Sequence, residues 1–167
     1  MIAARNPSNI IPCRPAHLLY LCECMRQEEQ EQYVALTCAE KYDPDVAARG
    51  LINTAANGYA VTALCQDNTP AVAGGYEEIL PGVWQSWMVG SEKGWAEQWR
   101  SITKASRWLA DRLFQLGARR VQTVSLASRT KAIEWFERGL GLKPEGIWRG
   151  YGRDGQDVAA FSRVRGE

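Results

Sequence analysis

The sequence predicts a mixed α/β domain, in which helices pack around one mixed sheet. Three observations lead to this prediction: three short strand-like segments follow one another between residues 59 and 89, a long amphipathic helix comes next, and a strand, a helix and a hairpin end the chain. Strands joined by short turns pair antiparallel, whereas a strand reached through a helix returns parallel. We therefore expect an α+β arrangement: an antiparallel meander, a parallel strand after a crossover helix, and a C-terminal hairpin.

The first third of the chain predicts a tail, a strand and a helix. Residues 1–8 are polar and irregular, which is typical of a flexible tail, and residues 9–14 form a candidate edge strand. Apolar residues at helical spacing predict a helix over 16–25. The stretch 26–32 is rich in Glu and Gln and predicts an exposed continuation of that helix. With no repeat or linker in the sequence, we expect residues 9–167 to form one domain.

The next helix has a clear start. Asp43 is suited to cap it, Pro44 fits its first turn, and Asp45 favours the positive end of the helix dipole. Gly58 is expected to end this helix. The meander strands are then predicted at 59–64, 71–79 and 83–89.

The long helix has the clearest pattern in the sequence. Its apolar stripe consists of Trp95, Trp99, Ile102, Ser106, Leu109, Leu113 and Leu116, and Gly117 suits its C-terminal cap. A strand is predicted at 120–126. Ser128 is expected to cap a helix over 129–140, and Asp154-Gly155 predicts the turn of a hairpin whose strands are 146–151 and 158–164.

Composition limits the classes of function. The 20 Lys and Arg residues nearly balance the 19 Asp and Glu residues, which argues against a broad nucleic-acid surface. No apolar run is long enough to cross a bilayer, and Met1–Ile11 lacks the features of a signal peptide, so we expect a cytoplasmic protein that does not bind membranes. Five cysteines without disulfide spacing, and a single histidine, His17, predict free thiols and no metal site. His17 is expected to be a surface or capping residue.

The C-terminal half resembles a known family. Residues 121–142 run from a strand through a polar cap to Ala132-Ile133, an aromatic pair and Gly139-Leu140-Gly141. This segment, together with the order of the elements, resembles the GNAT superfamily of N-acetyltransferases. Residues 82–90, the Trp-rich helix after them and the turn at 149–155 also resemble GNAT-like proteins encoded by tailed phages.

The resemblance implies a site for acetyl-CoA. In the family, the fourth strand pairs with the pantetheine arm, which here places Trp87, Met88, Val89 and Gly90 along the cofactor. The following turn and helix N-terminus hold the diphosphate, which implies that Ser91, Lys93 and Gly94 contact it.

Several residues depart from the family pattern. The turn has one glycine, bulky Trp95 would crowd a diphosphate, and the carboxylates of Glu92 and Glu97 would repel it. Phe136 stands where the family commonly has a proton-donating tyrosine, and Arg129 stands where it commonly has Asn. Glu77 and Glu78 are the candidate general bases, although solvated strand carboxylates explain them as well.

Two functions therefore remain open. The chain is either an acetyl-CoA-dependent N-acetyltransferase that acetylates an amine, or a GNAT-like phage virion or assembly protein that is inactive and binds protein partners, located in the host cytoplasm or the virion. Missing acid–base groups weaken the first function without excluding it, because positioning alone accelerates acyl transfer. The seven tryptophans are explained mostly by packing, and any surplus suits a protein interface.

Overall fold

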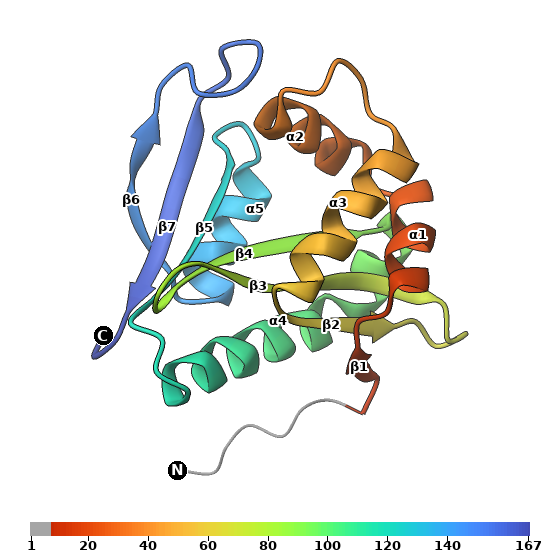
Figure 1. Cartoon of the computed structure of the whole chain (residues 1–167), viewed down its shortest axis with the longest axis horizontal. Coiled ribbons are helices and arrows are strands. Elements are labelled where there is room, and N and C mark those ends of the chain that lie inside the picture. The colour runs from red at the N-terminus through yellow and green to blue at the C-terminus, as the bar shows by residue number, and fades with distance from the viewer. Residues whose placement is uncertain (1–7) are drawn as a thin grey trace.

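A computed structural model describes residues 8–167 of the protein. It contains a seven-stranded mixed sheet with helices on both faces (Figure 1). The strands are β1 (Ile10–Pro12), β2 (Gly58–Leu64), β3 (Pro70–Leu80), β4 (Val83–Gly90), β5 (Arg120–Leu126), β6 (Lys143–Trp148) and β7 (Val158–Val164). The helices are α1 (Pro15–Glu23), α2 (Gln27–Thr37), α3 (Pro44–Ala56), α4 (Glu92–Gln115) and α5 (Thr130–Glu134), which continues into the π-helical turn η1 (Trp135–Gly139). The predicted fold class is confirmed. The predicted tail lies outside the described residues, apart from Ser8, which is in a turn.

The strand order is β1-β2-β3-β4-β5-β7-β6. β2, β3 and β4 form the predicted antiparallel meander, and β5 pairs parallel to β4 after the crossover helix α4. The parallel ladder is short: it joins Val83–Gln85 to Arg120–Gln122. Beyond these residues the two strands diverge, which leaves a V-shaped gap between their ribbons (Figure 1).

Helices α1 and α3 cover one face of the sheet. Leu18, Leu21 and Ala47 form a buried cluster with Val89 and other residues of the sheet. The predicted cap is confirmed, because Asp43 Oδ1 accepts hydrogen bonds from the N–H groups of Asp45 and Val46 at 3.0 and 3.2 Å. This capped helix anchors the N-terminal half against β3.

The prediction for residues 26–32 was wrong. α1 ends at Glu23, and a separate helix, α2, begins at Gln27. The chain turns between them because the Arg26 N–H donates to the Gly90 carbonyl at 3.1 Å, at the end of β4. Glu29 is buried rather than exposed. The course of this segment depends on contacts with β4, about 60 residues further along the chain. Local composition does not reveal such contacts.

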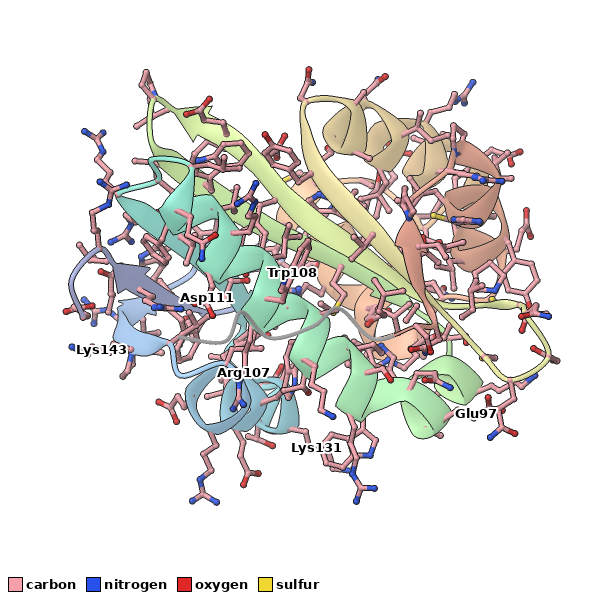
Figure 2. The ribbon with its side chains drawn as sticks, turned by 90° about the horizontal axis from the view of Figure 1, so that it is seen from below. Glu97, Arg107, Trp108, Asp111, Lys131 and Lys143 are labelled. Atoms are coloured by element: carbon pink, nitrogen blue, oxygen red, sulfur yellow. The ribbon has the colours of Figure 1, made fainter. Side chains whose placement is uncertain are left out.

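Helices α4 and α5 cover the opposite face, and Figure 2 shows them side by side, with Arg107 of α4 beside α5. Ile102, Leu109 and Leu113 are buried in the predicted stripe, but Trp99 and Leu116 are exposed. The Arg107 Nε donates to the Gly139 carbonyl, which fastens α4 to η1. The stripe was therefore wrong at Trp99 and Leu116, whereas Trp95 at its start is half-buried and packs against the core.

The last helix and the hairpin differ in detail from their predictions. The helix begins at Thr130, its N-cap is Arg129, and no side chain caps it, so the prediction of a Ser128 cap was wrong. The hairpin strand β6 begins three residues earlier than predicted. A register shift beside Gly146, whose φ is +131°, bends it.

Candidate functional site

The gap between β4 and β5 opens into a cavity of about 810 Å³, and its lining comes from both faces of the sheet. The Gly82 carbonyl accepts a hydrogen bond from the N–H of Arg120 in β5, and alternate residues of a strand direct their backbone groups to the same side. The backbone of Met88 therefore faces β5 as well. The ladder ends at Gln85, so no strand pairs with the N–H and carbonyl of Met88 on this side.

Helix α2 lies in the opening between the diverging strands (Figure 1). The carboxylate of Glu29 accepts three hydrogen bonds there: from the Gly90 N–H at 2.9 Å, from Trp95 Nε1 at 3.0 Å and from the Arg26 guanidinium at 2.9 Å. Burial raises the pKa of the Glu29 carboxyl, and the charge of Arg26 opposes this shift. Glu29 and Arg26 thus occupy both backbone groups of Gly90.

Gln32, one turn further along α2, holds the β5 side of the gap. Its side-chain oxygen accepts hydrogen bonds from Ser125 Oγ, from the Leu126 N–H and from Arg129 at 3.1, 3.0 and 2.9 Å. One amide therefore ties the end of β5 and the start of α5 to α2. The polar side chains of Arg26, Gln32 and Arg129 line the wide end of the gap, whereas the interior of the cavity is mainly apolar.

Two tryptophans close the side of the gap between α4 and α5. The rings of Trp95 and Trp135 pack edge to face with centroids 5.5 Å apart, and the Arg26 guanidinium lies 4.7 Å from the Trp95 ring. Trp135 is fixed in turn by a hydrogen bond from its Nε1 to Thr103 Oγ1 at 2.8 Å. Trp95 is therefore a packed part of the wall.

The N-terminus of α4 is capped within the chain. Ser91 caps it by accepting a hydrogen bond from the Gly94 N–H at 2.9 Å, and the Ser91 carbonyl accepts from the Trp95 N–H. Gly94 is needed for packing, since a Cβ built there would lie 2.0 Å from the Ala71 carbonyl oxygen. Lys93 forms an exposed ion pair with Asp67. Ser91, Lys93 and Gly94 thus already have partners.

The four residues predicted along the pantetheine arm are in β4, but they do not share one orientation. The backbones of Trp87 and Val89 face β3, with which they are in register at Gly75 and Ala73. Their side chains pack with α1 and α3. Only Met88 has backbone groups that are open to the gap.

The candidate bases differ in position. Glu77 lines the cavity, and its register partner is Gln85, at the end of the parallel ladder. Glu78 Oε1 accepts a hydrogen bond from the Gly82 N–H at 2.7 Å, which assigns it to the β3–β4 turn. Phe136 packs against Phe161, with ring centroids 5.5 Å apart. Of the two carboxylates, Glu77 alone is next to the gap.

Sequence reasoning missed the residues of α2. Glu29, Gln32 and Leu36 recur at steps of three and four, which places them on one face of a helix. This spacing was a usable signal, but two of the three residues are polar and the segment carries several more charges. A search for apolar periodicity does not find a buried polar face.

The cysteines and His17 are not among the residues that line the cavity. All five cysteines are free; Cys24 and Cys38 are exposed, and the other three are buried or half-buried. His17 caps α1, with its Nδ1 3.2 Å from the Arg14 backbone N. Within residues 8–167, no group of three or more His, Cys, Asp or Glu side chains is placed to hold a metal ion, and no helix is both long and apolar enough to span a membrane.

Comparison with known proteins identifies the class of fold. The chain is similar to a probable GNAT-family acetyltransferase from Chromobacterium violaceum, with 23% identity, a TM-score of 0.68, and 99% of this chain and 92% of that chain covered. It is also similar to a GNAT phosphinothricin acetyltransferase from Sinorhizobium meliloti in complex with acetyl-CoA, with 16% identity, a TM-score of 0.73, and 93% and 86% covered. A third is RimL, a ribosomal L7/L12 α-N-protein acetyltransferase in complex with coenzyme A, with 13% identity, a TM-score of 0.68, and 96% and 97% covered.

These likenesses establish the GNAT acetyltransferase fold, which agrees with the resemblance of residues 121–142. No protein-family model matches the sequence, and no curated protein matches it in sequence. The three structures described above do not point to a phage-encoded protein, so that part of the resemblance stays a prediction.

Proposed function

We propose that this protein is a slow N-acetyltransferase that takes its acetyl group from a pantetheine thioester held between β4 and β5. The observation that carries the proposal is the gap itself: the parallel ladder ends at Gln85, and the N–H and carbonyl of Met88 face a cavity of about 810 Å³. A chain that contains amide groups fits such an edge, because it can take the place of the missing strand. The acetyl-CoA and coenzyme A in two of the similar structures support the same ligand class.

The fit to acetyl-CoA differs along the ligand. The Met88 edge and the apolar cavity suit the pantetheine arm, whereas the end of β4 presents the Glu29 carboxylate and the Trp95 ring, which disfavour a diphosphate. When bound, acetyl-CoA would supply an activated thioester carbonyl. We expect weak binding, dominated by the arm.

The residues around the gap favour positioning over acid–base catalysis. Met88 would orient the arm. Glu77, which lines the cavity, would accept the proton that the acceptor amine loses when its nitrogen bonds to the acetyl carbon. The departing sulfur would take its proton from water, because Phe136 has no proton to donate. Positioning alone supplies a large part of the rate in acyl transfer, so slow turnover is the expected result.

Filling the cavity tests this proposal. Ala132 of α5 lines the cavity, and Ala132→Trp is expected to weaken the binding of S-acetyl-pantetheine at least about tenfold by occupying its volume. Glu137→Trp, on the exposed side of η1, is the matched control and is expected to leave affinity unchanged. Isothermal titration calorimetry measures both. Equal affinity in the two variants would place the ligand outside the gap.

A second candidate function rests on an exposed aromatic cluster. Trp148 and Tyr151 are 41% and 59% exposed, their rings lie 4.9 Å apart, and Ile147 beside them is 53% exposed. Aromatic residues of this kind are enriched at protein interfaces, which favours an inactive, partner-binding protein. This second function would be favoured if the folded, unaltered protein neither binds the thioester nor transfers its acetyl group.

A further inference from the structure

Two arginines meet at the wide end of the gap, although they come from opposite sides of it. Arg26 precedes α2 and adjoins the end of β4, whereas Arg129 precedes α5 at the end of β5. Their side chains are only 17% and 12% exposed. Both line the cavity, so their charges act on whatever enters it.

The two guanidinium groups share one carboxylate. A single oxygen of Glu28 lies 3.1 Å from Arg26 and 3.4 Å from Arg129. Glu28 is 46% exposed, so its side chain can turn out to water at little cost. Glu29, by contrast, is buried and fixed by three hydrogen bonds.

The arginines keep unused donors. Within residues 8–167, the buried Nε atoms of Arg26 and Arg129 have no hydrogen-bond partner. Buried polar atoms usually do have partners, and a guanidinium offers five donors in a fixed plane that matches carboxylate and phosphate oxygens. The 3.4 Å contact between Arg129 and Glu28 is also long for a charged pair.

We infer that Arg26 and Arg129 form an oxyanion-binding site at the wide end of the gap, in which the Glu28 carboxylate stands in for the phosphate or carboxylate group of a ligand. A ligand oxyanion displaces Glu28 towards solvent and takes up the unused donors. The oxyanion belongs either to the diphosphate of an acyl-CoA or to an anionic amine acceptor. In the first case the diphosphate lies beside the two arginines, because Glu29 occupies the end of β4. Binding of the oxyanion itself requires no acyl transfer.

Inorganic pyrophosphate is the probe, and Glu28→Gln is the decisive variant. Glu28→Gln removes the competing charge, and we expect pyrophosphate to bind at least about fivefold more tightly than to the unaltered protein. Glu31→Gln is the matched control, since Glu31 is on the same helix, has the same charge and contacts Gln27 instead. Adding Arg129→Gln to Glu28→Gln is expected to abolish the gain, with circular dichroism confirming the fold.

Two further titrations of Glu28→Gln identify the source of the oxyanion. If acetyl-CoA binds more tightly and S-acetyl-pantetheine does not, the site takes the diphosphate. If pyrophosphate binds more tightly and does not compete with acetyl-CoA, the site takes an anionic acceptor. The inference is overturned if pyrophosphate binds Glu28→Gln and Glu31→Gln equally, or binds neither. That result leaves the thioester proposal intact, because Ala132→Trp tests it separately.

Discussion

Replacing Gly94 by alanine is expected to lower the free energy of unfolding by about 3 kcal/mol. The added Cβ would lie 2.0 Å from the Ala71 carbonyl oxygen and 2.5 Å from the Ala71 Cα, and both atoms belong to the backbone of β3. α4 would therefore have to move away from the sheet. The loss is expected with and without ligand, since it arises from packing and not from a cofactor contact.

Gly50→Ala is the matched control for this substitution. Gly50 is in α3, and a Cβ there meets no atom of the described residues within 4 Å. Alanine is a better helix former than glycine, so Gly50→Ala is expected to raise stability by about 0.5–1 kcal/mol. Urea unfolding of both variants measures the difference. Similar stability of the two variants would contradict the close approach of α4 and β3.

Replacing Glu29 by alanine is expected to cost about 3–5 kcal/mol, because it removes the buried partner of Arg26 and leaves two further donors without an acceptor. Arg26 would lose its buried carboxylate, and the Gly90 N–H and Trp95 Nε1 would lose their acceptor. Glu29→Gln is expected to cost less, since the amide oxygen still accepts a hydrogen bond from Gly90.

Glu31→Ala is the control for Glu29→Ala and is expected to change stability by less than about 0.5 kcal/mol, as exposed substitutions usually do. Thermal and urea unfolding at neutral pH measure both variants. If Glu29→Ala were as stable as Glu31→Ala, the contacts of α2 with the end of β4 would not contribute to the fold.

The course of the sheet could be predicted because its signals are local. Turn residues separate the meander strands, and an uninterrupted amphipathic helix of the right length forces β5 to return parallel to β4. Asp43 likewise marked its helix start through a side chain that caps the adjacent backbone. These features depend on neighbours in sequence, so the residue order alone carries them.

The candidate site could be predicted only in outline. The resemblance placed it at β4, but among the four residues proposed along the arm only Met88 is open to the gap. The backbones of Trp87 and Val89 face β3, and the backbone groups of Gly90 are occupied by Arg26 and Glu29. Glu29 and Gln32 reach the gap through contacts with residues 61 and 93 positions away. Their burial could not be predicted from the local sequence, because a polar side chain is buried only where distant residues supply hydrogen-bond partners.

Amide hydrogen exchange at Met88 tests the central claim most directly. The Met88 N–H faces the gap with no strand partner, so a pantetheine arm along β4 is expected to slow its exchange about tenfold at saturating acetyl-CoA. The N–H groups of Trp87 and Val89, which face β3, are expected to change much less. Unchanged exchange at Met88 at acetyl-CoA concentrations that saturate binding would contradict a thioester site between β4 and β5.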